Sequence, residues 1–476
     1  MLGLFGTLQL GTRGLATQRQ GVEVAGHNLA NASNPAYSRQ RVSIRSTAEV
    51  MGQYGPVGTG AEVAGIQQIR SQLLDSQIVV EGSVGGSLEA QQSALQYAQS
   101  RLGQQLDRLS SGTEASTASN GVGGGRQIAA GLADLFNAFQ SLSTNPTSLT
   151  ERHIALSRAS ELAVQFNQLD SGLGTLDTQL NQTLTLEARS ANGLMAEVAS
   201  LNSQISRIEG GGMGVANDLR DQRQAKLEEL GRIVQFDPVE QPGGTVDIAI
   251  GGVLFVNGSE TPAQLETFDP GDGRLQLRAT GTTDALAITG GRLHGTLDSR
   301  DGPLQELRNA IRGIASNLVS EVNAIHSSGF GLDGTNGQPF FLGTSASDMR
   351  VNPNLASNPR QLQASADPSA PGNNAVALRL AQLGTKPIAA LGGQTLAGRY
   401  SQGISDIGEA LSSVNRQISD HDVVSSMLAS QRESVSGVSV DEEMTDLTRF
   451  QRAYQASAKL ITTVDEMLEI TLGLKR

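Results

Sequence analysis

The sequence contains no cysteine and no tryptophan among its 476 residues. Without cysteine the chain can form no disulfide bond and offers no thiol for catalysis or metal binding. Aromatic residues make up 3% of the chain, which excludes a core built mainly from aromatic rings. The apolar contacts must therefore come from aliphatic side chains.

Long apolar runs and clusters of basic residues are also missing. No stretch approaches the roughly 20 consecutive apolar residues that a membrane-spanning helix needs. The first charged residue is Arg13, so the N-terminus lacks the cationic segment of a secretory signal peptide. The net charge of −12 disfavours nucleic acid as a partner. We expect a soluble chain with no membrane or nucleic-acid partner, which is cytoplasmic or is exported by a route that reads no such signal.

Residue constellations for catalysis or metal binding are scarce. The five histidines are scattered, and none stands in a His-Glu-x-x-His pattern. Gly437–Asp441 resembles half of a nucleophile elbow but lacks the second glycine, and Ser439 is better interpreted as a helix cap. Gly331–Gly337 resembles a calcium-binding loop but lacks the alternating acids and the final glutamate. We predict a protein that is not an enzyme, with no catalytic residues, no cofactor and no metal site.

The strongest pattern that is present lies at the C-terminus, in residues 435–476. Ser439 followed by Glu442 forms a capping box, in which each side chain binds a free backbone amide, and it predicts the start of a helix. Apolar residues then recur at spacings of three and four, with Ser457 in the one empty position. This stripe indicates a helix that packs along another long helix. Its apolar positions are Leu447, Phe450, Tyr454, Ile461, Val464 and Leu468.

A matching stripe occurs at the N-terminus, in residues 1–45. Gly11 and Gln18 stand at its gaps, and Asn34-Pro35 ends the helix because the residue before a proline is disfavoured in the α region. Residues 1–45 carry five arginines and one glutamate, whereas residues 435–476 carry seven acids and five bases, so the two ends have complementary charge. We predict that the ends pair as a coiled coil; two surface helices on one ordinary core are the alternative. The stripe comprises Leu4, Leu8, Leu15, Val22, Ala25 and Leu29.

Long helices are also predicted between the ends. A helix over residues 71–109 carries a leucine at every seventh residue, at Leu88, Leu95, Leu102 and Leu109. The segment 147–208 is apolar at helical spacing throughout, and one continuous helix of that length would be about 90 Å long. No single compact core encloses such a rod, so we predict an elongated molecule.

The composition changes between Ile233 and Ile288. Short runs such as Val246–Ile248 and Val253–Val256 alternate or are rich in β-branched residues, and Gly and Pro separate them, which is typical of strands. We predict a mainly α protein with an inserted β domain, folded as a hairpin in sequence, whose middle lies farthest from the paired ends. We predict three units. The first is a terminal coiled coil of residues 1–35 with 440–476, which forms an inner tube, and the second is a long helical rod of residues 36–235 with 299–439, which includes an irregular or β piece at 329–400. The third is a small β-rich outer domain of residues 236–298.

Both ends of the chain carry a family resemblance. Residues 21–42, GVEVAGHNLANASNPAYSRQRV, resemble the N-terminal signature of flagellar rod, hook and hook-associated proteins. Residues 441–472, DEEMTDLTRFQRAYQASAKLITTVDEMLEITL, resemble the C-terminal signature of the same group. Within that group, Tyr37–Val42, Asp218–Arg223 and Phe340–Gly343 resemble the proteins of the hook–filament junction. The β insertion adds nothing to the resemblance, and its modest size suggests fewer outer domains than larger relatives carry.

The resemblance implies a structural subunit with a flagellin-like layered architecture, an elongated coiled-coil rod formed by both chain ends. Such a subunit leaves the cytoplasm through the flagellum-specific type III export apparatus and polymerises outside the cell as a ring between hook and filament. The implied partners are further copies of the chain, the hook subunit, a second junction protein on the filament side and a cytoplasmic export chaperone that binds the C-terminal helix. The two terminal stripes would form the interface with these partners.

The sequence is also compatible with two other functions. One is a different flagellar axial protein, such as a hook or distal rod subunit, which the long seams at 88–109 and 162–208 disfavour. The other is a hydrolase carried on the filament.

Overall fold

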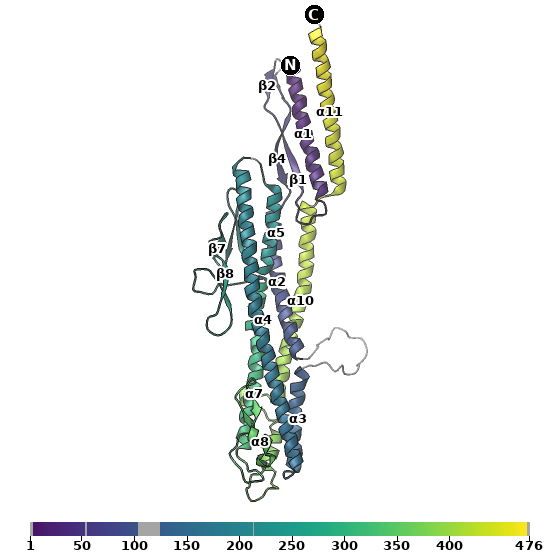
Figure 1. The fold of residues 1–476 in the computed structure, drawn as a ribbon. Coiled ribbons are helices and arrows are strands. Elements are labelled where there is room, and N and C mark those ends of the chain that lie inside the picture. The colour runs from purple at the N-terminus through teal and green to yellow at the C-terminus, as the bar shows by residue number, and fades with distance from the viewer. Residues whose placement is uncertain (1–2, 53–54, 103–123, 213, 474–476) are drawn as a thin grey trace.

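The computed structural model describes residues 3–52, 55–102, 124–212 and 214–473. The molecule is long, narrow and mainly helical, with both termini at the same end (Figure 1), which confirms the predicted fold class. Among the described residues, no helix is both long and apolar enough to cross a membrane. The helices are α1 (Leu4–Ala30), α2 (Gln72–Leu102), α3 (Gly124–Thr144), α4 (Leu149–Gly210), α5 (Asn217–Ile233), α6 (Gly291–Asp301), α7 (Pro303–His326), α8 (Pro353–Ser357), α9 (Ala375–Gln382), α10 (Leu396–Ser436) and α11 (Val440–Gly473).

The strands form small antiparallel sheets. Strands β1 (Gln40–Ser46) and β4 (Ala61–Gln68) pair as a long hairpin, with β2 (Val50–Gly52) and β3 (Gly55–Val57) at its tip. Strands β5 (Asp237–Glu240), β6 (Val246–Ile250) and β7 (Val253–Val256) make one sheet, and β8 (Leu265–Phe268) and β9 (Gln276–Ala279) make another. The irregular segment 329–400 contains β10 (Phe341–Leu342) paired with β11 (Arg350–Val351).

The chain is nested as a hairpin in sequence. Helix α1 lies along α11, and α2 lies along α10 in the next layer (Figure 1). The second contact is anchored by Gln92, whose Nε2 donates to Asn415 Oδ1 at 2.7 Å, and by His421, whose Nδ1 lies 2.7 Å from Glu81 Oε1. The pairing of chain ends expected from the stripes is therefore present. The expected seam position Leu109 lies outside the described residues.

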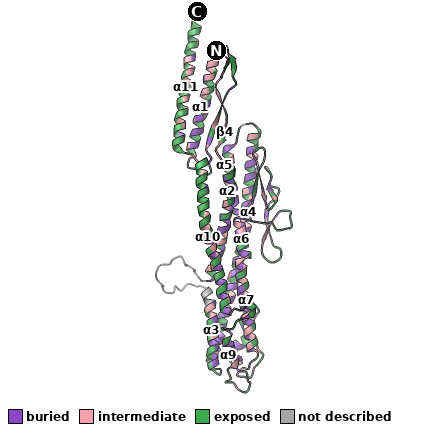
Figure 2. Ribbon diagram, turned by 180° about the vertical axis from the view of Figure 1, so that it is seen from behind, coloured by how far each residue is buried: buried purple, intermediate pink, exposed green. Residues whose placement is uncertain are grey.

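Helix α4 is the longest of the described helices and runs along the rod (Figure 1). Ser148 caps it, because the Glu151 N–H donates to Ser148 Oγ at 3.3 Å. Its 62 residues correspond to about 90 Å, and the helix is continuous, as its apolar spacing predicts. The buried residues of the molecule concentrate along this rod, whereas the terminal pair is mostly exposed or half-buried (Figure 2).

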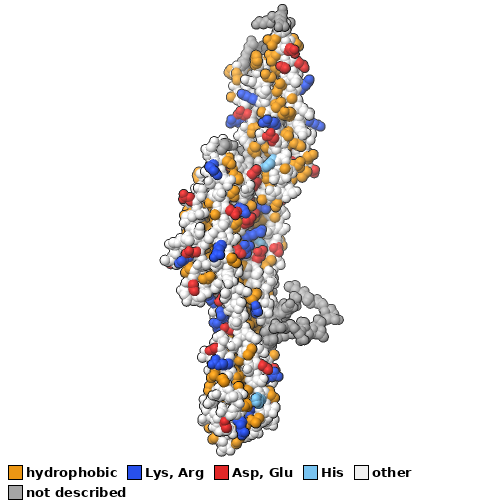
Figure 3. Space-filling view, in the orientation of Figure 1, with side chains coloured by type: hydrophobic (Ala, Val, Ile, Leu, Met, Phe, Trp, Pro, Cys, Tyr) orange, Lys and Arg blue, Asp and Glu red, His pale blue; other side chains and the backbone are white. Residues whose placement is uncertain are grey.

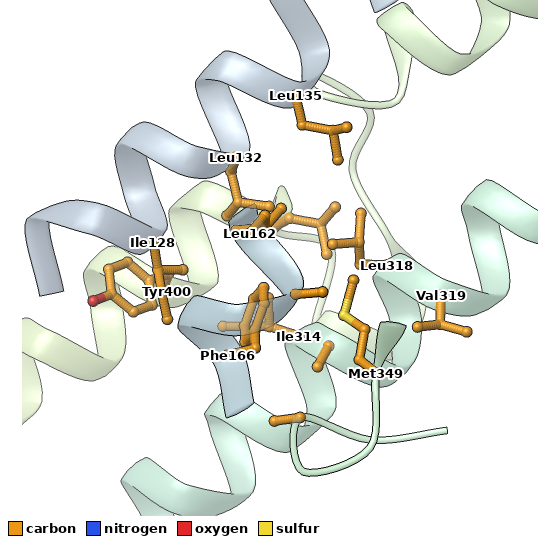
Figure 4. Close-up of a cluster of buried hydrophobic side chains, with 14 of the residues drawn as sticks. Ile128, Leu132, Leu135, Leu162, Phe166, Ile314, Leu318, Val319, Met349 and Tyr400 are labelled. Atoms are coloured by element: carbon orange, nitrogen blue, oxygen red, sulfur yellow. The ribbon is translucent and has the colours of Figure 1, made fainter. Parts of the chain in front are cut away.

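The end of the rod remote from the termini has an aliphatic core. Side chains from α3, α4, α7 and α10 meet there, with Met349 from the irregular segment (Figure 4). Three aromatic rings meet in the same place, where Phe340 lies edge-on to Phe139 at 5.5 Å and to Phe341 at 4.8 Å between ring centroids. Residues 329–400 are thus irregular in backbone but well packed.

The β segment shares its core with the rod. Ile248, Phe255 and Leu265 belong to one buried cluster with Val198 of α4 and Leu230 of α5. Residues 291–298, at the C-terminal end of the predicted β-rich unit 236–298, are helical and belong to α6. Three glycines at 290, 291 and 295 give this stretch the composition of a loop. In the structure Gly291 and Gly295 lie in close contact with neighbouring backbone, and Gly290 lies against the side chains of Ser83 and Gln235.

Candidate functional site: the terminal helix pair and its junction with the rod

Helices α1 and α11 pack in antiparallel directions at very short range. Gly11 lies opposite Ile461 and Gly21 lies opposite Phe450. A Cβ atom on Gly11 would be 2.8 Å from Ile461 Cγ1, and one on Gly21 would be 2.6 Å from Phe450 Cδ1. The absence of a side chain at these positions therefore lets the two helices approach closely. Ser457, the empty position of the C-terminal stripe, lies against Gly14.

The N-terminal stripe lies beside this contact and not at its centre. Leu4, Leu8, Leu15, Val22 and Leu29 are all half-buried. Within the described part of α1, the buried positions are Gly11, Thr17, Gly21, Val24, Ala25 and Asn28. The buried face of α1 therefore includes Ala25 of the predicted stripe and consists otherwise mainly of small and polar residues, which a search for large apolar side chains passes over.

The C-terminal stripe faces α1 more directly. Val464 is buried, and Leu447, Phe450, Ile461 and Leu468 are half-buried. Tyr454, however, is 36% exposed. The pair also presents exposed apolar side chains (Figure 3). These are Phe5, Met444, Met467, Ile470 and Leu472.

The terminal pair joins the rod where two helices break at the same level. Helix α1 ends before Asn34-Pro35, and α10 ends at Ser436, with Gly437 as its C-cap. The Arg39 N–H donates to Ser436 O at 2.9 Å, and this hydrogen bond joins the segment that follows α1 to the end of α10. Ser439 caps α11 as predicted, with the Glu442 N–H 3.5 Å from its Oγ. The predicted bond from the Glu442 side chain back to a free backbone amide is wrong, because the Glu442 carboxylate accepts from Arg39 Nη1 at 2.7 Å.

Asn28 is the centre of this junction and is 1% exposed. Its Nδ2 donates to Gln40 O at 2.9 Å and to Glu443 Oε2 at 3.0 Å. Its Oδ1 accepts from the Tyr37 hydroxyl at 2.7 Å and from the Gln40 N–H at 3.0 Å. Every hydrogen-bonding position of this amide is thus occupied.

Arg39 and Tyr37 extend the network. Arg39 Nε donates to Glu443 Oε1 at 2.7 Å, so the buried carboxylate is paired with a cation. Burial, with a further contribution from Asp218, raises the pKa of Tyr37 well above its ordinary value. The phenol therefore stays protonated and donates to Asn28.

Helix α5 supplies the third side of the junction. Asp221 is buried, and it accepts from the Ser38 N–H at 3.0 Å and from Arg70 Nη1 at 3.0 Å. Burial raises the pKa of Asp221 from its ordinary value. Gln40 Nε2 donates to Asp218 Oδ1 at 2.7 Å. Tyr37–Val42, Asp218–Arg223 and the start of residues 441–472, which all resemble flagellar proteins, therefore meet at one place, whereas Phe340–Gly343 belongs to the remote end of the rod.

The sequence does not predict this meeting. The blocks are recognisable as signatures, but their patterns assign no role to Asn28, Arg39 or Glu443. The available signal was polarity on an otherwise small or apolar helix face, at Asn28 in α1 and at Glu443 in α11.

A groove of about 540 Å³ opens beside the junction. His27, Tyr37, Asp218 and Lys226 are among the residues that line it. His27 Nε2 lies 3.7 Å from Asp218 Oδ2. Within the described ranges, no group of three or more His, Asp or Glu residues is placed to hold a metal ion. The hydrogen bonds of the junction hold α1, α5, α11 and the start of β1 together.

Two protein families match parts of the chain. The family described as flagellar hook-associated protein FlgK helical domain matches residues 121–341. The family described as flagellar basal body rod FlgEFG protein C-terminal matches residues 429–474, which cover α11. A helical rod with paired termini and these two matches define an axial protein of the bacterial flagellum.

Relatives that match over nearly the whole chain indicate which flagellar axial proteins it resembles. The chain is 25% identical to flagellar hook-associated protein 1 of Bacillus subtilis, over 98% of either chain, and 23% identical to that of Escherichia coli, over 97% of this chain and 98% of the relative. The solved flagellar hook junction protein FlgK from Burkholderia pseudomallei shares its fold, with a TM-score of 0.62 at 16% identity, over 76% of this chain and 100% of that one. The chain belongs to the family of flagellar hook-associated protein 1.

Proposed function

We propose that the chain is a structural subunit of the bacterial flagellum that polymerises at the hook–filament junction and adapts one to the other. The observation that carries this function is the terminal pair, which has almost no core of its own. Within the described part of α11, the buried residues are Glu443 and Val464. A long helix that leaves so much apolar surface uncovered is stabilised by contact with other molecules.

The polymer is proposed to contact its neighbours through the two terminal stripes. Further copies of the chain would cover the exposed apolar side chains of α1 and α11. The hook subunit would lie on one side of the ring, and a second junction protein on the filament side. A cytoplasmic export chaperone would hold α11 before export through the flagellar type III apparatus. The support is that the apolar face of α11 is exposed in the single chain.

The units of the chain are proposed to have separate roles. Residues 1–35 with 440–476 would line an inner tube, the rod of residues 36–235 with 299–439 would surround it, and residues 236–298 would face outward. In support, β7 and β8 lie on the opposite side of α4 from α10 (Figure 1).

A structural function also fits the chemistry of the chain. The relatives are flagellar structural proteins, and the junction's carboxylates are engaged with amide, guanidinium and backbone groups. A zymogram with the purified protein tests the alternative of a filament-borne hydrolase, and a cleared zone would favour it.

A single substitution tests the terminal interface. Ile461 packs on Gly11, so Ile461→Asp would place a carboxylate in the helix seam at a large desolvation cost. We expect Ile461→Asp to be exported but to abolish filament growth in complemented cells. The neighbouring exposed position provides the control, and Thr462→Asp should support filaments. Normal filament counts with Ile461→Asp would exclude the terminal pair as the assembly interface.

A further inference from the structure

Arg223 of α5 is a buried cation that forms no ion pair with a carboxylate of the described residues. The residue is 5% exposed. Its Nη1 donates to Asn202 Oδ1 at 2.9 Å and to the backbone oxygen of Gly244, in the turn between β5 and β6. Its Nε and Nη2 donate to no group within the described ranges. These two nitrogens form one edge of the guanidinium, and that edge matches the two oxygens of a single carboxylate.

A pocket of about 240 Å³ lies beside Arg223, between α2, α5 and the β5–β6 hairpin. Among the described residues, Arg308 Nε is an unpartnered buried nitrogen that is closed to solvent, whereas Nε and Nη2 of Arg223 are not. Because Arg223 lines the pocket, its free edge is accessible from there. The apolar part of the wall comprises Val79, Leu227, Phe236, Pro238 and Val246.

Two other arginines line the pocket, and carboxylates neutralise both of them. Arg70 donates from Nε to Asp75 and from Nη1 to Asp221. Arg220 donates from Nε and Nη2 to the two oxygens of Glu209, each at 2.8 Å. The positive charge that still lacks a direct counterion at the pocket is therefore that of Arg223.

The charge of Arg223 persists at neutral pH. Burial, with a further contribution from Arg220, lowers the pKa of Arg223 to about 10, so the guanidinium stays protonated. Glu240 also lines the pocket and opposes an anion there. Its Oε1 lies 3.7 Å from Arg220 Nη1, and its side chain is 40% exposed, so solvent screens its charge.

We infer that this pocket binds a carboxylate carried on a short aliphatic chain, with the carboxylate on Nε and Nη2 of Arg223 and the chain against Phe236 and Leu227. The volume is below that of pockets for drug-sized ligands, so the ligand is a few carbon atoms long. The carboxylate belongs either to a free short-chain acid or to an acidic side chain of a second copy of this chain. The second source rests on the proposed function.

The site is tested by calorimetric titration of the purified full-length chain with butyrate at constant ionic strength. Butyrate should bind roughly tenfold more tightly than acetate, because each buried methylene group contributes about a factor of four. Butylammonium, which has the same chain and the opposite charge, should not bind. Arg223→Lys should weaken butyrate binding roughly tenfold, since lysine lacks the paired donors. The matched control is Arg189→Lys, at an exposed position of α4, and it should bind butyrate normally.

A second variant leaves the bonds of Arg223 in place. Glu240→Gln removes the opposing carboxylate at the pocket, so butyrate should bind roughly threefold more tightly. A purely structural role of Arg223 predicts no such gain. The inference is overturned if the unsubstituted chain binds no butyrate, if butylammonium binds equally well, or if Glu240→Gln leaves the affinity unchanged.

Filament counts in complemented cells distinguish the two sources of the carboxylate. If an acidic side chain of a second copy occupies the pocket, Arg223→Lys lowers the filament count and Arg189→Lys does not. If the ligand is a free acid, both variants form normal filaments although Arg223→Lys no longer binds butyrate well. The titration uses the free chain, so its result does not depend on the proposed assembly function.

Discussion

Gly86 of α2 lies so close to Arg232 of α5 that a Cβ atom on Gly86 would be 2.0 Å from the Arg232 carbonyl oxygen. On the same helix, the carbonyl oxygen of Ser87 would be 2.1 Å from a Cβ on Gly295 of α6. Backbone therefore meets backbone where α5 and α6 cross α2. No rotation of a side chain can relieve an added methyl group at either glycine.

Gly86→Ala should therefore destabilise the rod. We expect the free energy of unfolding to fall by about 2 kcal/mol, since overpacking exceeds the gain in helix propensity. Gly193→Ala is the control, because nothing lies within 4 Å of the added Cβ on α4, and it should raise stability by about 0.5–1 kcal/mol. Urea unfolding of both variants measures the difference. A stabilised Gly86→Ala chain would mean that the crossing is looser than described.

Gly21→Ala should separate the terminal pair without affecting the rod. The new methyl group would collide with the Phe450 ring near its attachment to the backbone. We expect filament counts to fall sharply while the thermal midpoint of the rod is unchanged. Gly26→Ala, also on α1, has no atom within 4 Å of its added Cβ and should behave like the unsubstituted protein. Similar filament counts for the two variants would contradict the close contact.

Phe255→Ala tests whether the β segment folds independently of the rod. The ring is fully buried in the cluster that contains Val198 of α4 and Leu230 of α5. Because the core is shared, its loss should lower the stability of the helices by about 3–5 kcal/mol, as followed by helical circular dichroism. Leu254→Ala, at the exposed neighbouring position, should cost less than about 1 kcal/mol. If Phe255→Ala leaves the helical transition in place, residues 236–298 are an autonomous domain.

Stability should fall on acidification because of His326. Its ring is fully buried; Nδ1 lies 2.8 Å from Gln338 O, and Nε2 accepts from the Gln363 N–H at 3.0 Å. Protonation would set Nε2–H against that N–H, and burial lowers the pKa of His326 from 6.5 to about 4. The unfolded chain thus binds more protons between these two values, so the contribution is complete above the unfolded pKa and is lost as pH falls towards the folded one.

We expect this histidine to account for a loss of about 2 kcal/mol in unfolding free energy between about pH 7 and pH 5. Urea unfolding at the two pH values measures it. The His326→Gln chain, which has no titrating group at this position, should lose correspondingly less over the same interval. An identical pH dependence in the two chains would show that the histidine is not held neutral.

The helical rod and its ends follow from the amino-acid sequence alone. Repeats at three and four residues, Ser148 before α4 and Ser439 before α11 act locally, because a helix forms between residues that are close in the chain. The pairing of the termini also follows, since a long apolar stripe needs a partner. The two family signatures, at residues 21–42 and 441–472, are sufficient to indicate the flagellum.

Which residues carry the contacts depends instead on how the elements meet in the folded chain. The α1–α11 contact includes Gly11 and Gly21. A glycine is required at each position because a side chain from the other end of the chain, Ile461 or Phe450, lies against it. Asn28 and Glu443 are 415 positions apart, and neither has a local pattern that identifies its partner. The β segment likewise alternates as an independent sheet would, but its apolar face is completed by α4. Such contacts arise between segments that are distant in sequence, and the periodicity of one segment does not contain that information.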